Sequence, residues 1–467
     1  MFKEHPNYKN QKIVAAALVL VLSVFIFSSS ALAAFTITEY SIPTSSSSPN
    51  YITTGPDGNL WFTEFLSNKI GKITTSGVIT EYPTTTGGSN PQGITEGPDG
   101  NLWFTEFQAK KIGKITTSGV ITEYTIPTNN AYPNNITTGP DGNLWFTENT
   151  ANNIGKITTS GVITEYPIPT SNSNAQSITT GPDGNLWFSE EFGNKIGKIT
   201  TSGTITEYAV PTSAGDPLGM TVGPDGNLWF TEFHIGSTGK IGKITTSGTI
   251  TEYSIPTLSS SPRDIIAGPD GKLWFTEEFG DKIGSITTSG TITEYPVSGS
   301  GTAVFGITIG PDNNVWFAKA NDNKIAQLAL PPKPAIINHT TNVAGGSSVV
   351  VDVLTGISGN PDPSTLTIIS GPSHGTAVDP PGTITYTPNP GYSGTDSLTY
   401  QVCSLDDPGI CTQSSLTFQV LAASTTAPST GFGAESANPI RTLVLYGLIS
   451  GSLILIGLET RRRTAKK

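Results

Sequence analysis

The stretch GPDGNLWFTE, residues 55–64, decides the fold of this chain. It is followed by NKIGKITTSG at 68–77 and VITEYP at 78–83, and the same wording then recurs as far as about residue 330. Every tryptophan of the protein belongs to one copy of it: Trp61, Trp103, Trp145, Trp187, Trp229, Trp274 and Trp316. Successive tryptophans are 42 residues apart, with one interval of 45 residues. Repeats of this length, made of short strand-like segments between Gly-containing turns, predict a β-propeller with one blade per repeat.

Each repeat contains four strand-like segments, which we expect in the first copy at 51–54, 59–64, 70–75 and 78–83. The PDG sequence between the first two predicts a tight turn, because Pro presets its φ and Gly takes the left-handed position. The apolar LWF of the second segment alternates onto both faces, which is typical of a strand buried on both sides. We therefore expect the tryptophans to pack between neighbouring blades.

The number of segments indicates how the repeats join. The seventh repeat ends after its third segment near Leu328, whereas FTITEYSIP at 35–43 is a fourth segment with no blade before it. Pairing the first strand with the last repeat removes the open edges of a linear array. We therefore predict an all-β chain whose residues 35–330 form a seven-bladed β-propeller, closed by the N-terminal strand beside 323–328.

Two columns of charged residues follow the repeat. Three positions after the tryptophans stand Glu64, Glu106, Glu148, Glu190, Glu232, Glu277 and, in the seventh repeat, Lys319. At the start of the third segments stand Lys69, Lys111, Asn153, Lys195, Lys240, Lys282 and Lys324. One interpretation is a set of exposed cross-strand ion pairs, each worth about 0–1 kcal/mol. The other is a rim of carboxylates around the channel mouth, able to hold a cation.

The wording GPDGNLWFTE…NKIGKIT…ITEYPIPT closely resembles the virginiamycin B lyase (streptogramin B lyase) family, from Phe35 to about Leu330. The resemblance implies a seven-bladed propeller. It also implies an enzyme that opens a cyclic depsipeptide antibiotic at its ester by elimination, using Mg²⁺. That chemistry needs a histidine as general base and carboxylates as metal ligands.

This sequence departs from the family at those positions. The resemblance places the catalytic histidine at Arg263, a second functional histidine at Leu218 and one metal carboxylate at Ser261. A guanidinium is protonated at physiological pH and cannot accept the proton. The later metal carboxylate is matched by Glu277, and His234, in the loop of the fifth repeat, is a candidate substitute base.

The positions eleven residues before each tryptophan surround the channel mouth in the family. Here they are Asn50, Gln92, Asn134, Gln176, Leu218, Arg263 and Phe305. We expect Asn50, Gln92, Asn134, Gln176 and Arg263 to form a rim that binds a polar small molecule, a glycan or a peptide.

Three functions remain open. The first is a surface-anchored protein for ligand binding or adhesion, without the catalytic histidines of the lyases and without a cofactor. The second is a magnesium-dependent C–O lyase that uses Glu277 and His234. The third is a purely structural component of the envelope.

The two ends of the chain predict export and anchoring. Residues 1–33 combine basic residues, an apolar run and an Ala-x-Ala site, as in a secretory signal peptide, although an uncleaved anchor is the alternative. Residues 441–458 are apolar enough for a transmembrane helix, and the basic tail 459–467 would lie in the cytoplasm. We therefore expect an extracellular protein with a single C-terminal membrane anchor.

The stalk expected at 422–440 contains APSTG. With the apolar run and basic tail behind it, this pentapeptide resembles an LPxTG-type sorting signal, with Ala427 in place of Leu. Sortase would cut between Thr430 and Gly431 and join the protein to the cell envelope, and a plain membrane anchor is the alternative.

A second domain follows the repeats. A Pro-rich linker at 331–335 leads into residues 336–421, which resemble bacterial cadherin-like or immunoglobulin-like modules and predict a β-sandwich. Cys403 and Cys411 are the only cysteines, and in an exported protein they predict a disulfide. The formal charge of −11 and the lack of a basic stripe argue against a nucleic-acid partner.

Overall fold

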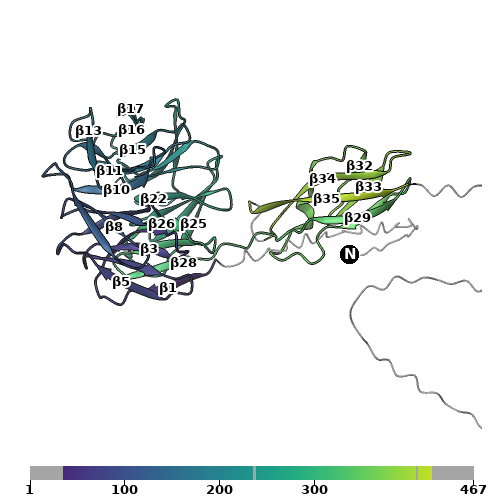
Figure 1. Cartoon of the computed structure of the whole chain (residues 1–467), viewed down its shortest axis with the longest axis horizontal. Coiled ribbons are helices and arrows are strands. Elements are labelled where there is room, and N and C mark those ends of the chain that lie inside the picture. Colours follow the sequence, from purple (N-terminus) through teal and green to yellow (C-terminus); the bar gives the residue numbers. More distant parts are fainter. Residues whose placement is uncertain (1–34, 235–237, 406–408, 423–467) are drawn as a thin grey trace, which may run out of the picture. The chain divides into compact units, whose positions relative to one another are not determined.

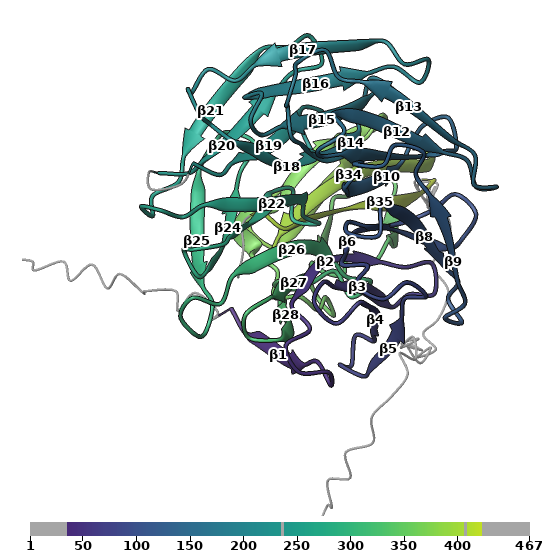
Figure 2. The ribbon, with the colours of Figure 1, turned by 90° about the vertical axis from the view of Figure 1, so that its left-hand side faces the viewer.

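The structure is a computed structural model that describes residues 35–234, 238–405 and 409–422. Seven four-stranded antiparallel sheets occupy the repeat region, and Figure 2 shows them arranged about a common centre. Within each sheet the first three strands follow one another in the chain and pair with their neighbours. The PDG turns take the expected form, with the glycine at positive φ, as at Gly58 (71°).

The first strand of each sheet lies nearest the common centre (Figure 2): β2 (Pro49–Thr54), β6 (Pro91–Glu96), β10 (Pro133–Thr138), β14 (Ala175–Thr180), β18 (Pro217–Val222), β22 (Pro262–Ala267) and β26 (Val304–Ile309). The second strands are β3 (Leu60–Glu64), β7 (Leu102–Glu106), β11 (Leu144–Glu148), β15 (Leu186–Glu190), β19 (Leu228–Glu232), β23 (Leu273–Glu277) and β27 (Val315–Lys319). The third strands are β4 (Lys69–Ile73), β8 (Lys111–Ile115), β12 (Asn153–Ile157), β16 (Lys195–Ile199), β20 (Lys240–Ile244), β24 (Lys282–Ile286) and β28 (Lys324–Leu328). The fourth strands are β5 (Ile79–Pro83), β9 (Ile121–Thr125), β13 (Ile163–Pro167), β17 (Ile205–Ala209), β21 (Ile250–Ser254), β25 (Ile292–Pro296) and, in the seventh sheet, β1 (Ile37–Ser41).

The N-terminal strand occupies its expected place. β1 pairs antiparallel with β28 in a register that sets Ile37 opposite Leu328 and Ser41 opposite Lys324. Side-chain hydrogen bonds also join the first and last sheets, for example from Thr54 Oγ1 to the carbonyl of Ile309 at 2.7 Å. The first strand of the chain and the last repeat are therefore joined, 285 residues apart in sequence at the Glu39–Lys324 contact.

The tryptophans pack between sheets, as the repeat predicts. Trp61 is fully buried and shares a cluster with Ile94 and Phe104 of the next sheet. Its indole Nε1 donates to Asp57 Oδ1 at 3.0 Å, and its ring stacks on Tyr82 with 5.6 Å between centroids. This set of contacts recurs in every sheet, which explains why the repeat keeps its Asp, Trp and Tyr.

The seventh sheet completes the same set with a residue from the other end of the repeat region. Trp316 stacks on Tyr40, with 5.5 Å between ring centroids, and Tyr40 belongs to β1. Tyr40, from the ITEY sequence of the N-terminal strand, therefore replaces the tyrosine that the seventh repeat lacks.

The C-terminal domain is a β-sandwich (Figure 1). Its elements are β29 (His339–Ala344), β30 (Val349–Asp352), the 3-10 turn η1 (Pro363–Thr365), β31 (Thr367–Ser370), β32 (Gly375–Val378), β33 (Thr383–Pro388), β34 (Gly394–Cys403) and β35 (Cys411–Leu421). One sheet has the order β29-β35-β34-β31 and the other β30-β33-β32. Strands β29 and β32 were not foreseen from the sequence.

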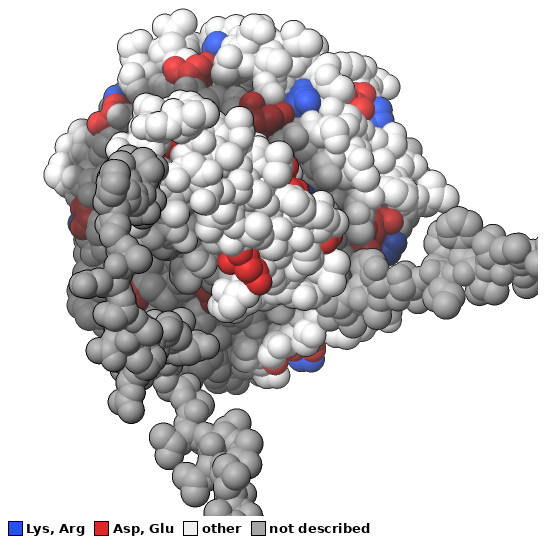
Figure 3. All heavy atoms as spheres, turned by 90° about the vertical axis from the view of Figure 1, so that its right-hand side faces the viewer, with Lys and Arg blue, Asp and Glu red and all other residues white. Residues whose placement is uncertain are grey.

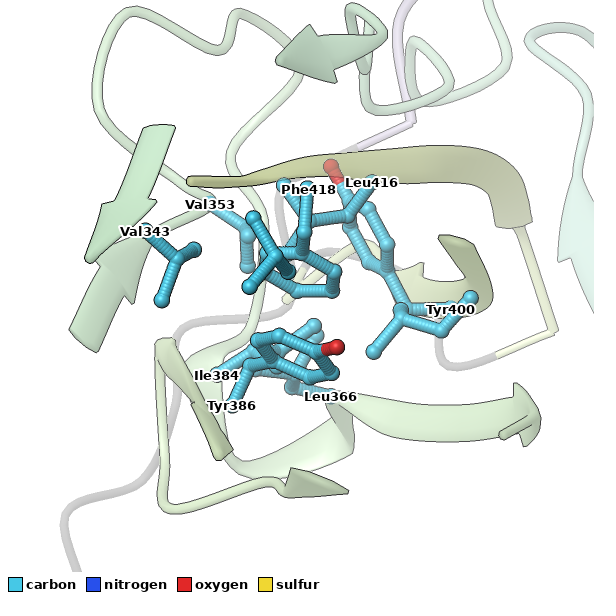
Figure 4. Packing of buried hydrophobic residues seen from close by; sticks show 10 residues of the cluster. Val343, Val353, Leu366, Ile384, Tyr386, Tyr400, Leu416 and Phe418 are labelled. Atoms are coloured by element: carbon cyan, nitrogen blue, oxygen red, sulfur yellow. The ribbon is translucent and has the colours of Figure 1, made fainter. Parts of the chain in front are cut away.

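The core of this domain joins its two sheets (Figure 4). Tyr386 of β33 and Phe418 of β35 are fully buried, and their rings stack with 3.8 Å between centroids. The predicted disulfide between Cys403 and Cys411 is confirmed, and it closes the β34–β35 hairpin.

Several features predicted for the chain ends fall outside the described residues: the signal peptide at 1–33, the sorting site at Thr430 and Gly431, the transmembrane helix at 441–458 and the tail at 459–467. Within residues 35–234, 238–405 and 409–422, no helix is long and apolar enough to cross a bilayer. On the face drawn in Figure 3, uncharged side chains dominate, and the Lys and Arg side chains lie scattered, mostly beside Asp or Glu.

Candidate functional site

The glutamate column is not an exposed rim, which corrects one of our two interpretations. Glu64, Glu106 and the other four members of the column are fully buried at the ends of the second strands. A carboxylate without exposed surface cannot line the mouth of a channel. The rim of cation-binding carboxylates that the sequence allowed is therefore wrong.

The alternative interpretation, a set of exposed ion pairs between these glutamates and the lysines, is also wrong, because the lysines contact other carboxylates. Glu106 lies opposite Lys111 in the strand register, as expected. The Lys111 ammonium, however, contacts Glu123 of the fourth strand, with Nζ 2.8 Å from Oε2. Thr86 of the preceding segment donates to the same carboxylate at 2.6 Å. The lysine therefore pairs with the glutamate of ITEY and leaves the column glutamate without a cation.

In four of the sheets the pKa of the column glutamate is raised and that of the ITEY glutamate is lowered: Glu64 and Glu81, Glu106 and Glu123, Glu190 and Glu207, Glu232 and Glu252. Burial raises the pKa of Glu106 to about 8, and the neighbouring charge of Glu123 adds to the shift. Burial alone would also raise the pKa of Glu123, but hydrogen bonds from Lys111, Thr85 and Thr86 outweigh it and hold that pKa at about 2. Near neutral pH the pair therefore holds one proton, on Glu106.

The seventh sheet replaces this carboxyl pair by a cation. Lys319 stands at the column position, and its side chain is 1% exposed. Its ammonium contacts Glu39 of β1 and Asp322, the latter at 2.7 Å, while Lys324 reaches the other oxygen of Glu39 at 2.6 Å. This exception in the repeat therefore anchors the N-terminal strand.

The predicted mouth residues stand at the second position of each first strand, and hydroxyl groups hold their backbone in place. Thr63 Oγ1 of the first sheet donates to the carbonyl of Gln92 in the second at 2.7 Å. The equivalent hydroxyl of Thr105 donates to Asn134 at 2.7 Å, and that of Thr231 to Arg263 at 3.0 Å. These bonds set the mouth residues in register from sheet to sheet.

A cavity of about 110 Å³ lies among these strands. Its lining residues come from several sheets: Tyr51, Gln176, Glu191, Leu218, Phe233 and Arg263. Of the five predicted rim residues, Gln176 and Arg263 thus line one cavity. Asn134 supports it, because its amide donates to the Gln176 side chain. Asn50 and Gln92 are not among the lining residues.

Arg263 is held on two sides. Its Nη1 atom lies 2.9 Å from Glu278 Oε2, and its guanidinium lies over the ring of Phe305, 4.2 Å from the centroid. Gln176 donates to Glu191, and both residues line the same cavity. The cavity therefore presents one cation, one carboxylate and one amide in fixed positions.

Tyr51 and Asp264 are two further titratable groups near Arg263. Burial raises the pKa of Tyr51 to about 12, and the charge of Asp264 adds to the shift. Burial also raises the pKa of Asp264 to about 6, against hydrogen bonds from the amides of Ile307 and Ile265. The Tyr51 phenol is therefore neutral at physiological pH, and it can donate a hydrogen bond to a ligand.

The residues that the lyase alternative needs do not assemble here. Glu277 is fully buried beside Glu294, and Ser261, at the place of the other metal carboxylate, is 1% exposed. His234 is not among the lining residues of the cavity. In the described part of the chain, no group of three His, Cys, Asp or Glu side chains is placed to hold a metal ion. The described residues around this cavity therefore offer no set of ligands that fits a Mg²⁺ ion.

Sequence reasoning missed Glu191, Phe233 and Glu278 at this site. They share one repeat position, four residues after the tryptophan, where the residue type changes from blade to blade. The change of residue type at this one position of an otherwise uniform repeat was the signal that could have identified these three residues.

Comparisons with known proteins agree with the fold. Residues 30–198 and 170–333 match the virginiamycin B lyase family, and residues 331–419 match a bacterial Ig domain. A streptogramin B lyase structure is 42% identical, with a TM-score of 0.61, over 63% of this chain and 98% of that one. Selenomethionine-substituted virginiamycin B lyase from Staphylococcus aureus is 44% identical, with a TM-score of 0.60, over 63% of this chain and 99% of that one.

A catalytically inactive His-to-Ala variant of the Staphylococcus aureus enzyme, with quinupristin, matches with the same identity, coverage and TM-score. The repeats, the strand order and these matches lead to one assignment. The chain belongs to the virginiamycin B lyase family and carries a bacterial Ig domain behind its propeller.

Proposed function

We propose that this chain is an extracellular ligand-binding protein that has lost the elimination chemistry of its lyase relatives. The observation that carries the proposal is Arg263. The family resemblance places the general-base histidine there, and the guanidinium cannot accept a proton. Its contacts with Glu278 and Phe305 hold it as a fixed hydrogen-bond donor.

The cavity around Arg263 suits recognition of a polar group. Gln176 offers an amide, Glu191 a carboxylate and Tyr51 a phenol, while Leu218 and Phe233 supply apolar surface. Its volume of about 110 Å³ is small beside the ~300 Å³ at which sites for drug-sized molecules begin. It therefore receives one polar group of a larger ligand, such as a glycan or a peptide.

An array of glycans and peptides tests this proposal, with the wild-type chain and two variants. Arg263→Ala removes the fixed donor, and we expect it to weaken binding of the best probe by about tenfold or more. Gln92→Ala is the matched control, because Gln92 has the same place in its repeat but does not line the cavity. Equal binding by all three proteins would refute the assignment of this site.

The second candidate is a retained streptogramin B lyase activity. It is favoured by the 42–44% identity to lyases over nearly their whole length. The activity would have to use another base, such as His234, and we expect Glu277→Ala to abolish it if Glu277 holds the metal.

We also propose that the seven sheets form a closed ring and that the chain is exported and held at the cell envelope by its C-terminal region. The pairing of β1 with β28 supports the closed ring. The apolar run at 442–458 and the APSTG stretch support the anchor. Mass spectrometry of the enzymatically released envelope fraction tests the anchor. A fragment ending at Thr430 indicates sorting, and recovery of the protein in the culture medium would contradict any anchor.

A further inference from the structure

A second cavity lies where the third and fourth sheets meet, and its volume is about 200 Å³. Asn149 and Thr150 follow β11, Asn172 and Asn174 precede β14, and Phe192 follows β15. These five residues line the cavity, and none of them carries a charge. Three amides and a hydroxyl offer both donors and acceptors, as a neutral polyhydroxylated ligand requires.

The second cavity adjoins the cavity around Arg263. Asn174 Nδ2 donates to Glu191 Oε2 at 2.6 Å, and Gln176 donates to the same oxygen. Asn174 lines the second cavity, whereas Gln176 and Glu191 line the first. One carboxylate therefore stands between the two cavities.

The lining of the second cavity is available to a ligand. The side-chain amides of Asn149 and Asn172 have no hydrogen-bond partner among the residues that the structure describes. Phe192 is 70% exposed, so a flat apolar face is presented to solvent beside them. An amide pair next to an exposed ring combines the polar and apolar contacts typical of small-ligand sites.

The repeat itself shows that the fold does not require these side chains. Asn172 and Asn174 both have φ of 54°, a conformation that Asn tolerates well. In the first repeat, however, Ser46 and Ser48 adopt φ of 55° and 53° at the same places. The backbone conformation alone therefore does not account for the two asparagines.

We propose that this cavity is a second subsite, which binds one neutral sugar unit of an oligosaccharide whose next unit places one polar group in the Arg263 cavity. The proposal rests on the proposed binding function and names its ligand class. With about 200 Å³ the subsite has room for a single sugar ring. The exposed face of Phe192 contacts the apolar face of that ring, and the amides of Asn149 and Asn172 bind its hydroxyl groups.

The test uses the purified full chain and an array of neutral oligosaccharides of one to six units. We expect binding to strengthen from one unit to two or more. Phe192→Ala should weaken binding of the probes of two or more units by about tenfold. Asn172→Ser, which introduces the residue of the first repeat, should weaken binding of the longer probes by about fivefold.

Leu66→Ala is the matched control, because Leu66 occupies the same repeat position as Phe192, is 58% exposed and lines neither cavity. If Arg263→Ala weakens binding while Phe192→Ala changes nothing, the subsite is refuted and the proposed function stands. If peptides bind and neutral oligosaccharides do not, the ligand class is refuted. If neither class binds, the subsite and the proposed function both fail.

Discussion

Replacing the buried carboxyl group of Glu106 by an amide should change how the stability of the propeller depends on pH. The pKa of Glu106 is raised from 4.5 to about 8 in the folded chain, chiefly by burial. Between those two values the folded state holds a proton that the unfolded state has lost. Unfolding then releases a proton, so stability falls as the pH rises through this window.

The magnitude follows from the size of the shift. One pKa unit corresponds to about 1.36 kcal/mol, so this glutamate lowers the free energy of unfolding by about 1.4 kcal/mol for each pH unit inside the window. Glu106→Gln is neutral at every pH and removes that term. Between pH 5.5 and 7.5 the variant should therefore gain roughly 2 to 3 kcal/mol relative to the wild type.

Urea unfolding of both proteins at several pH values measures this difference. Glu123→Gln serves as a second variant, because it removes the neighbouring charge and should lower the pKa of Glu106 while leaving Glu106 in place. A stability difference between Glu106→Gln and wild type that stays constant from pH 5.5 to 7.5 would show that Glu106 is already ionised in the fold. That result would refute the assignment of a proton to Glu106 near neutral pH.

Three further substitutions test a packing contact, an ion pair and the disulfide. Trp145→Ala should lower the free energy of unfolding by about 3–5 kcal/mol in a denaturation experiment, because a fully buried ring is removed from between two sheets; a loss below about 1 kcal/mol would contradict that role. Glu39→Gln should cost roughly 2–4 kcal/mol, because Lys319 stays buried without its carboxylate from β1. Since the pKa of Glu39 is lowered to about 2, this contribution should be present above pH 4.5 and vanish as the pH falls towards 2, and a loss that does not depend on pH would contradict the ion pair. Replacing both Cys403 and Cys411 by Ser should lower the stability of the C-terminal domain by about 2.5 kcal/mol, and an unchanged unfolding midpoint for that domain would contradict a stabilising disulfide.

The fold was predictable because its determinants are local and repeated. Trp61, Asp57 and Tyr82 lie within one repeat, and the contacts among them hold the indole that packs against the next sheet. The pairing of β1 with β28 was also predictable, since FTITEYSIP supplies the one segment that the seventh repeat lacks. Strand ends differed by one or two residues, because the turns rather than the strands carry the clear signals.

The environment of the glutamates was not predictable. A Glu at the end of a strand, opposite a Lys, is usually an exposed pair. Here the loops around it bury Glu106, and the Lys111 ammonium finds a better site at Glu123, where threonine groups also donate. The position of the Lys111 ammonium depends on Thr86, which lies 25 residues earlier in the sequence, and the repeat motif does not reveal this contact.

The candidate site was predictable in part. Gln176 and Arg263 share a repeat position, and the fold brings them to one cavity. Glu191 and Phe233 were missed because the position they share holds Phe, Asn, Glu or Ala in different blades. A repeat position without a fixed residue type cannot be interpreted from the packing of the repeat. At this position the repeats differ from one another.

The most direct measurement for the central claim is mass spectrometry of a streptogramin B, such as quinupristin, after incubation with the purified protein and Mg²⁺. With Arg263 at the place of the general base, we predict that the cyclic compound stays intact, as in a control without protein. Ring opening at an enzymatic rate, abolished by Glu277→Ala, would contradict the account and establish the protein as a lyase.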